Sequence, residues 1–292
     1  MVKIERAQLE HFEDIYKLLL SFKYTRNTKN DWKNLFKDHF QSEKNYYGYI
    51  LKDGERIVGF INYLFAKRKF NGKVVTFCNI GSWIVLEKYR NKSLSLLMPL
   101  VRLNDCILTN FTASKAVYKI LKTLKFKEVG DDFIIIPPIP GISFLEIFKS
   151  DIRILFGGKV KKYLNEDELI INNDHSNPDF KCKHILLKDC EGICYIIAKR
   201  AYRNRLPFLH IHYIGNSRIF SKYVGVIRIL CPFYFKVLSI IVDKRFLGSE
   251  KINNVISDKL QSHRLCKPNL TYSVGDLRKI DNLYSEFIVL HI

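Results

Sequence analysis

The chain has 292 residues, 47% of them apolar, and its 48 lysines and arginines outnumber 29 aspartates and glutamates for a formal charge of +19. This length favours two domains, and the apolar content is enough for two cores. The charge attracts anions, such as phosphorylated small molecules, nucleic acid or an anionic membrane, without distinguishing among them. The seven cysteines, an odd number, lie mostly in apolar runs. They favour a reducing, cytoplasmic location with free buried thiols over a disulfide framework.

Membrane insertion and secretion are not expected. The first residues are charged, so they do not form a signal peptide. The most apolar window is 223–242, but Arg228, Pro232 and Lys236 interrupt it, which favours a helix followed by a buried strand over a transmembrane segment. Because the sequence contains no RNA-recognition signature, zinc finger or helix-turn-helix, nucleic acid is not the expected partner.

In the first half, alternating strand and helix patterns predict the order β-α-α-β-β-β-α-β-α-β. The predicted strands are 2–6, 47–51, 57–63, 73–85, 106–108 and 133–136, and the predicted helices are 12–20, 32–40, 94–101 and 114–124. Lys52-Asp53-Gly54-Glu55 is a turn signal between two β runs and predicts a hairpin. Pro99 is awkward inside its helix and should kink or end it.

The junction after the strand 73–85 predicts a phosphate site. A short polar turn there passes into an apolar-periodic segment, in which Leu94, Leu97, Met98 and Val101 share one helical face. A helix that follows a turn presents unpaired N–H groups and the positive end of its dipole, which favour a phosphate. Arg90 and Lys92 would add positive charge beside these groups.

This junction, Val-x-x-x-Tyr-Arg-x-Lys-x-Leu over residues 85–94, resembles the acyl-CoA-binding motif of the GNAT superfamily of N-acyltransferases. The predicted order of elements is also that of the GNAT fold. Ser93 and Ser95 stand where glycines are usual, which is tolerable unless either position needs a positive φ. The resemblance implies acetyl-CoA, or another acyl-CoA, as co-substrate. It also implies a coenzyme site formed by Trp83, Val85, Arg90, Asn91, Lys92, Ser93, Leu94 and Ser95.

The second half resembles a degenerate copy of the first. Residues 186–193 align with residues 50–57, each a hairpin with an acidic turn. Further strands are predicted at 208–214, 237–242 and 287–292, and helices at 219–230 and 252–260. The turn after 208–214, Gly215-Asn216-Ser217-Arg218, lacks the basic phosphate-loop form, so we expect no second coenzyme there. An unrelated α+β domain remains the alternative.

The predicted fold is therefore α/β (α+β), with two tandem GNAT-like domains, each a mixed, mostly antiparallel sheet flanked by helices. The boundary is expected at Pro137–Gly141, where the prolines end a strand. Residues 1–138 would bind acyl-CoA, and residues 142–292 would form the acceptor site or a scaffold.

Candidate catalytic residues follow in part from the resemblance. Members of the superfamily often use a tyrosine on the last helix to protonate the leaving thiolate. Here Tyr118 lies one turn from the matching position, although it could equally be a core residue. His210 and His212 share one face of a predicted strand and could accept a proton from an ammonium group, or simply stabilise the sheet. Asp243, at a strand end, could bind the acceptor.

No metal is expected. Cys182, His184, Cys190 and Cys194 are close in sequence, but their spacing is not that of zinc sites, and side chains on a hairpin would not converge.

The expected function is that of a cytoplasmic acyl-CoA-dependent N-acyltransferase. Its acceptor would be a small, polar and anionic molecule, such as an amino sugar or sugar nucleotide in surface-polysaccharide biosynthesis. Two alternatives stay open. The protein could be a catalytically degenerate GNAT-derived binding or scaffold protein, or an acyltransferase acting on a peptide, protein or tRNA amine. The sequence leaves the acyl length and the oligomeric state open.

Overall fold

The computed structural model describes residues 2–22, 26–130, 132–140, 151–259, 262–268, 272, 274–277 and 279–292. The chain forms two compact units. The first comprises Met1–Val129, Ser262–Arg278 and Tyr284–Ile292, and the second comprises Gly130–Gln261 and Lys279–Leu283. Each unit therefore contains segments from both halves of the sequence. This grouping differs from the division expected at Pro137–Gly141, of which Gly141 lies outside the described residues.

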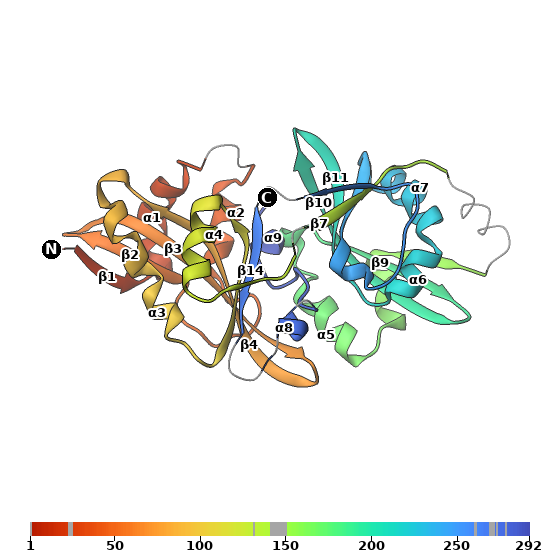
Figure 1. Cartoon of the computed structure of the whole chain (residues 1–292), viewed down its shortest axis with the longest axis horizontal. Coiled ribbons are helices and arrows are strands. Elements are labelled where there is room, and N and C mark those ends of the chain that lie inside the picture. Colours follow the sequence, from red (N-terminus) through yellow and green to blue (C-terminus); the bar gives the residue numbers. More distant parts are fainter. Residues whose placement is uncertain are drawn as a thin grey trace. The chain divides into compact units, whose positions relative to one another are not determined.

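The first unit is built on a seven-stranded sheet in the order β1-β2-β3-β4-β5-β14-β6. β4 and β5 pair in parallel and the other neighbours pair antiparallel. Figure 1 shows β14, in blue, inside a sheet whose other strands come from the first half of the chain. The strands are β1 (Val2–Arg6), β2 (Gly48–Asp53), β3 (Arg56–Phe70), β4 (Lys73–Val85), β5 (Cys106–Ala113), β6 (Lys127–Glu128) and β14 (His263–Lys267).

Helices complete the first unit. They are α1 (Phe12–Leu19), α2 (Lys29–Lys33), α3 (Met98–Val101), α4 (Lys115–Thr123), α8 (Val274–Leu277) and α9 (Glu286–Val289), with 3-10 segments at Leu9–His11, Asn34–Phe36 and Glu87–Leu96. α4 begins where expected because the Ser114 side chain caps its first turn, accepting from the N–H of Val117. Its buried Leu121 packs into a core shared with β3, β4 and β5.

The second unit has a seven-stranded sheet in the order β13-β7-β12-β11-β10-β9-β8, in which only the β11–β12 pair is parallel among the described strands. The strands are β7 (Asp132–Ile136), β8 (Arg153–Phe156), β9 (Lys183–Asp189), β10 (Gly192–Arg203), β11 (Leu206–Ile214), β12 (Ser239–Asp243) and β13 (Ile256–Lys259). The helices are α5 (Glu166–Asp174), α6 (Ser217–Lys222) and α7 (Val224–Phe235), with 3-10 segments at Gly157–Tyr163, Pro178–Phe180 and Lys244–Leu247.

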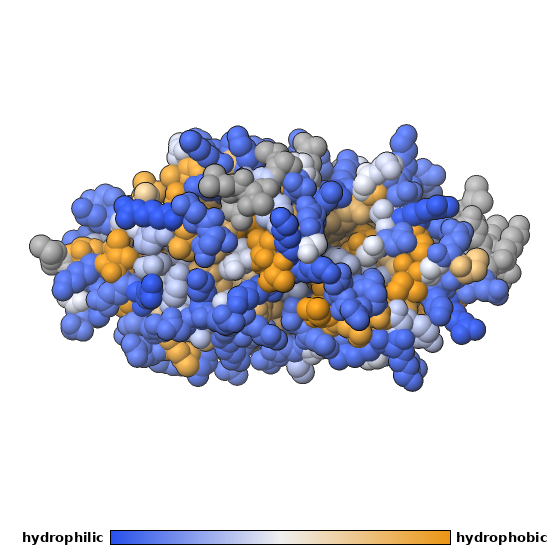
Figure 2. Space-filling view, turned by 90° about the horizontal axis from the view of Figure 1, so that it is seen from below, coloured by the Kyte–Doolittle hydropathy of each residue, from blue (hydrophilic) through white to orange (hydrophobic). Residues whose placement is uncertain are grey.

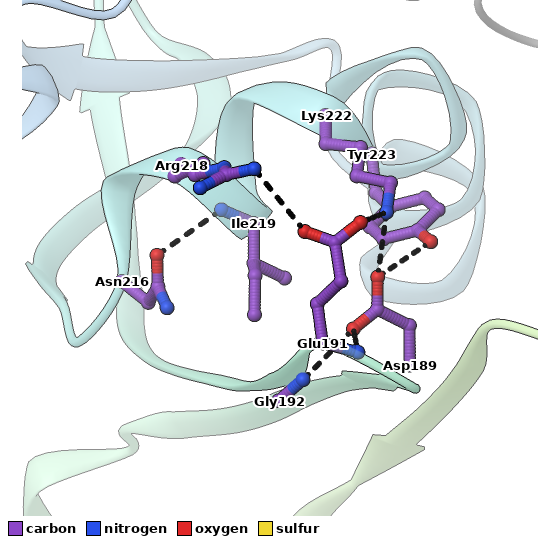
Figure 3. Close-up of polar contacts among 8 residues, drawn as sticks. All are labelled: Asp189, Glu191, Gly192, Asn216, Arg218, Ile219, Lys222 and Tyr223. Carbon is purple, nitrogen blue, oxygen red and sulfur yellow. Dashed lines mark hydrogen bonds and ion pairs between the residues drawn. The ribbon is translucent and has the colours of Figure 1, made fainter.

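The internal repeat predicted from the hairpins is present. In the first unit, the hydroxyl of Tyr89 donates to Asp53 at the β2–β3 turn, at 2.7 Å. In the second unit, the hydroxyl of Tyr223 donates to Asp189 at the β9–β10 turn, at 2.8 Å (Figure 3). Each acidic turn thus binds a tyrosine from a later segment. The prediction of two mixed, mostly antiparallel sheets flanked by helices is confirmed.

Four predicted elements are wrong in whole or in part. The helix expected over 32–40 is α2, which ends at Lys33, followed by a 3-10 segment that ends at Phe36. Residues 256–259 form the edge strand β13 instead of a helix, although Leu260 lies outside the described residues. Residues 286–289 form the one-turn helix α9 instead of a strand, because Ser285 caps the N–H of Phe287. The helix expected over 94–101 is a 3-10 segment that ends at Leu96, followed by the short helix α3. Pro99 has no N–H to donate, so it fits in the first turn of α3 but not inside a longer helix.

No helix in the described part of the chain is long and apolar enough to span a membrane. Figure 2 shows that hydrophilic side chains dominate the visible face, with apolar side chains in small groups between them.

Candidate active site

The parallel strands β4 and β5 separate part-way along their length. They pair only from Thr76↔Cys106 to Asn79↔Thr109. Beyond these pairs, β4 follows β3 as far as Val85, while β5 pairs with β14. A register shift opposite Phe60–Asn62 and a positive φ of 38° at Ser82 mark an irregularity in β4 at this point. Such bulges bend a strand away from its neighbour, and here the bend leaves an opening between β4 and β5.

Two cavities lie along this opening and share Trp83 and Val117 in their walls. The first has a volume of about 370 Å³. It is lined by Phe22, Trp32, Gly81, Ser82, Trp83, Asn110, Thr112, Ala113, Ser114, Val117, Glu286, Leu290, His291 and Ile292. The second, of about 410 Å³, is lined by Trp83, Ile84, Val85, Arg90, Ser93, Ala116, Val117 and Ile120. The first is aromatic and contains an acid, whereas the second is largely apolar and contains the cation Arg90.

Glu286 lies at the centre of the opening. The N–H of Glu286 donates to the side chain of Asn79, the last residue of β4 that pairs with β5, at 3.1 Å. Its carboxylate accepts from the hydroxyl of Thr112 on β5 and from Ser82 on β4, through both the backbone N–H and the hydroxyl. The residue is only 3% exposed. Glu286 therefore bridges the two separated strands.

The environment of Glu286 changes its acidity. Burial raises the pKa of this carboxyl from 4.5 to about 7, because removal from water disfavours the charge more than the hydrogen bonds from Thr112 and Ser82 favour it. Gly81 leaves the space for the carboxylate, since a Cβ at this position would lie 2.4 Å from Oε2. A carboxyl with a pKa near neutrality can accept a proton at physiological pH.

The residues after α9 form one wall of the first cavity and are held in place by Asn27 and by Asp31 of α2. The N–H of His291 donates to Asn27 at 2.6 Å, and Nε2 of His291 lies 3.3 Å from Oδ1 of Asp31. Trp32, the next residue in α2, lines the same cavity. This segment and α2 therefore bound the cavity together.

Four of the predicted coenzyme residues line these cavities: Trp83, Val85, Arg90 and Ser93. The other four do not line either cavity: Asn91, Lys92, Leu94 and Ser95. All four lie in the same 3-10 segment as Arg90 and Ser93, and the hydroxyl of Ser95 donates to the carbonyl of Lys92. Neither Ser93 nor Ser95 has a positive φ, so serine is compatible with the backbone at both positions where glycine is usual.

Tyr118 does not reach the cavities, although its neighbour Val117 lines both. The hydroxyl of Tyr118 donates to Glu128 at 2.5 Å, and its ring lies 4.1 Å from that of His263. These contacts direct the side chain toward β6 and β14. The structure therefore does not bring the predicted proton donor to the opening.

His210, His212 and Asp243 form a separate cluster in the second unit. The two imidazole rings lie 4.3 Å apart, as expected for alternate residues on one strand, and Nε2 of His210 lies 3.9 Å from Oδ1 of Asp243. All three are buried, Asp243 completely. Among the described residues, no group of three or more His, Cys, Asp or Glu side chains is placed to hold a metal ion.

The sequence analysis missed Glu286, Thr112 and Gly81. Gly81 lies in the predicted strand 73–85, whose end contributes Trp83 and Val85 to the expected coenzyme site, whereas Thr112 lies beyond the strand predicted over 106–108. Glu286 is separated from Thr112 by 174 positions, so nothing local connects them. The one available signal was a single acid, Glu286, next to the apolar run Phe287–Leu290. A carboxylate beside an apolar run is costly to bury, so it is rarely found there without a polar partner.

Comparison with solved structures identifies the fold. The chain is similar to a GCN5-related N-acetyltransferase from Kribbella flavida, with a TM-score of 0.57 and 12% identity over 91% of this chain and 70% of that one. A GCN5-related N-acetyltransferase from Anabaena variabilis gives a TM-score of 0.56 and 11% identity over 91% and 72%. The GCN5-related glucosamine N-acetyltransferase region of a fungal multi-domain β-N-acetylglucosaminidase gives 0.60 and 12% over 91% and 38%.

No protein-family model matches the chain. No curated protein sequence matches it either. At these identities the similarity to solved structures establishes the fold alone, and it confirms the predicted GNAT-like architecture over most of the chain.

Proposed function

We propose that this protein, which has the fold of the GCN5-related N-acetyltransferases, transfers an acetyl group from acetyl-CoA to an amine of a small polar acceptor. The observation that carries the proposal is the buried Glu286 at the opening between β4 and β5, beside two adjoining cavities. Such an opening gives an extended ligand access to strand edges that are otherwise sealed. The carboxyl places a proton acceptor in the wall of the first cavity, which adjoins the second cavity at Trp83 and Val117.

The proposed reaction has two proton movements. The acceptor arrives as an ammonium ion, and Glu286 takes one proton to leave a neutral amine. The amine nitrogen then forms a bond to the thioester carbonyl carbon, and the bond from that carbon to sulfur breaks. The second nitrogen proton passes to the departing thiolate, giving an amide and coenzyme A. The pKa of about 7 suits Glu286 to the first step, because a base works best near the operating pH.

Arg90 and Ser93 are the proposed contacts for the coenzyme phosphates, because both line the second cavity and Arg90 is the cation among its described lining residues. The guanidinium of Arg90 lies 3.7 Å from the exposed carboxylate of Glu87, a surface pair that contributes little. It can therefore exchange that partner for a phosphate. The pantetheine arm would lie along Trp83, Val85 and Val117, an apolar wall.

The first cavity supports a ring-shaped acceptor near the thioester, in which the amine is the only charged group inside the cavity. Trp32, Trp83 and Phe22 offer flat aromatic faces, and Ser114 and Asn110 offer polar groups. An amino sugar has both an apolar ring face and hydroxyl groups, so we propose this class, free or as a sugar nucleotide of surface-polysaccharide biosynthesis. The described residues that line this cavity include no lysine or arginine. An acceptor phosphate would therefore bind outside the cavity, where the net charge of +19 still favours it.

A cytoplasmic location is part of the proposal. All seven cysteines lie in the described part of the chain, and none forms a disulfide. Burial raises the pKa of the Cys194 and Cys231 thiols to about 12, so these thiols are inert core residues.

The test is thiol release from acetyl-CoA by the full-length protein with a panel of amino sugars, sugar nucleotides, polyamines and peptides. We expect an amino sugar or its nucleotide to give the highest kcat/KM. Activity on peptides alone would exclude the proposed acceptor class. If calorimetry shows no binding of acetyl-CoA at millimolar concentration, the enzyme proposal is wrong and the alternative of a binding or scaffold protein stands.

A further inference from the structure

A third cavity is lined by residues of the second unit and shares no described lining residue with the two cavities of the first unit. Its volume is about 520 Å³, within the range of about 300–1,000 Å³ that is typical of small-molecule sites. Three stretches of the chain line it: the 3-10 segment Gly157–Tyr163, the end of α5 with the loop that follows, and the residues that lead into β9. None of its described lining residues is a leucine, isoleucine, valine, phenylalanine, tyrosine or tryptophan. The cavity is therefore polar.

Three lysines converge on this cavity. Lys161 comes from the 3-10 segment, Lys181 from the turn before β9, and Lys183 from the first position of β9. No aspartate or glutamate is among the described lining residues. The ammonium group of Lys161 donates to the side-chain oxygen of Asn173, a neutral partner, at 3.1 Å. Within the described part of the chain, neither Lys161 nor Lys183 forms an ion pair with an acid. At least two of the three cations are therefore not neutralised by the protein itself.

Other cations of the same unit are paired with carboxylates. Lys222 lies 2.9 Å from Asp189 and also contacts Glu191 (Figure 3). Arg203 lies 2.7 Å from Asp258. The lysines of the cavity differ from these cations because they line a hollow that an anion can enter.

The other ionisable groups of the cavity are neutral near pH 7. Burial raises the pKa of the Cys182 thiol to about 11. Burial, and next the proximity of His175, lower the pKa of His184 to about 4. Burial also lowers the pKa of His175, against the opposing effects of two backbone carbonyls and of Asp174 and Asp281, which do not line the cavity. At neutral pH the charge of the cavity is therefore that of its lysines, and it attracts an anion.

A hydrogen-bond network fixes the buried wall of the cavity. The side-chain amide of Asn172, which is 1% exposed, donates to the hydroxyl of Tyr195 at 2.8 Å and to Nδ1 of His184 at 3.2 Å. The Tyr195 hydroxyl in turn donates to the same Nδ1 at 2.7 Å. In the loop after α5, the side-chain oxygen of Asn177 accepts from the N–H of Asp179 at 3.0 Å, and the NH2 group of Asn177 has no hydrogen bond to a described residue. The wall is thus preorganised, and Asn177 retains a donor for a ligand.

We propose that this cavity binds a small phosphorylated sugar, at a site separate from the one proposed for acyl transfer. A phosphate group matches the lysines, which bind phosphate as point charges. The sugar hydroxyls match the amide of Asn177 and the polar walls. Without an apolar wall, the cavity offers little to the pantetheine arm of a coenzyme or to the face of a nucleobase. The proposal does not depend on the role of Glu286.

Calorimetry with the full-length protein and glucose 6-phosphate tests the proposal directly. The ionic strength is held constant, because salt screens charged contacts. We expect one molecule to bind per chain, about tenfold or more tightly than inorganic phosphate, since the sugar hydroxyls add hydrogen bonds. Glucose without a phosphate should not bind at millimolar concentration.

Single lysine variants locate the site. Lys161→Ala and Lys183→Ala should each weaken the binding of glucose 6-phosphate by about tenfold or more, because each removes a charge-assisted contact. The matched controls are Lys162→Ala in the same 3-10 segment and Lys188→Ala in the same strand, neither of which lines the cavity. They remove the same charge and should change the Kd by less than about twofold. Lys161 is exposed, so its replacement leaves the fold intact even if that of the half-buried Lys183 does not.

The contrary results are distinct. Equal weakening in all four lysine variants would show attraction by the overall charge and would overturn the proposal. Weakening in Arg90→Ala would place the probe at the proposed coenzyme site and would also overturn it. Inorganic phosphate that binds as tightly as glucose 6-phosphate would overturn the assignment of a sugar, and no binding of either at millimolar concentration would overturn the site.

Discussion

Replacing Glu286 with glutamine is expected to lower activity and raise stability at the same time. Glutamine has nearly the same shape and can still accept from Ser82, while the hydroxyl of Thr112 can rotate to accept from the new amide. It cannot take a proton from an ammonium ion. General-base catalysis contributes about 10²–10⁴-fold, so we expect kcat/KM to fall by a factor in this range.

The gain in stability follows from the raised pKa. In the unfolded chain Glu286 ionises at about 4.5, and in the folded chain at about 7. Between these values the folded protein binds the extra proton, so the contribution of Glu286 to stability is greatest below pH 4.5 and is lost as the pH rises through 7. A pKa change of this size corresponds to about 3 kcal/mol for a fully buried group. Above pH 7, Glu286→Gln should therefore be more stable than wild type by up to this amount.

The assays are the pH dependence of kcat/KM by thiol release and urea unfolding at pH 5 and pH 8. Wild type should lose activity below pH 7 and be less stable at pH 8 through this group, and both trends should be reduced in Glu286→Gln. Glu128→Gln is the matched control, because Glu128 belongs to the same unit but pairs with Tyr118 and Lys122 away from the cavities. Equal activity of Glu286→Gln and wild type across this range would refute the assignment.

Four further outcomes are expected. Arg90→Ala should weaken acetyl-CoA binding by on the order of 1.5–3 kcal/mol in calorimetry, and Lys92→Ala, which lies outside both cavities, by much less; equal effects would show that the charge acts only at long range. Gly81→Ala should displace the Glu286 carboxylate and lower kcat, whereas Gly158→Ala, with open space around it, should not; full activity of the first variant would contradict the tight fit. Titration should give one acetyl-CoA per chain, and two equivalent sites would contradict the expectation that the turn after β11 binds no second coenzyme. A fragment ending at residue 140 lacks β14 and should fail to form a native sheet by circular dichroism, contrary to what the sequence division suggests.

Local patterns predicted much of the fold. The β4-to-Arg90 junction, the two hairpins and the pairing of His210 with His212 on one face each depend on residues close in sequence, where periodicity and turn chemistry decide the structure. The hairpin match also identified the repeat before any long-range contact was known. For these features the local preferences and the final fold agree.

Long-range features could not be predicted in this way. β14 inserts between β5 and β6, and β7 joins the second sheet. The edge of a sheet has unpaired N–H and C=O groups, and a strand distant in sequence can pair with them as well as a near one. Residues 256–259 have alternating polarity too weak to identify an edge strand. Glu286 became a site residue only because a segment near the end of the sequence crosses the opening between β4 and β5. His210, His212 and Asp243 carried the right chemistry for a base, yet the structure uses Asp243 to hold residue 282.

A structure of the full-length protein with acetyl-CoA bound tests the central claim most directly. The account predicts one coenzyme, with its thioester between β4 and β5 beside Glu286, its pantetheine arm along Trp83 and Val117, and its phosphates at Arg90 and Ser93. Coenzyme bound instead in the second unit, at the turn that follows β11, would contradict the account.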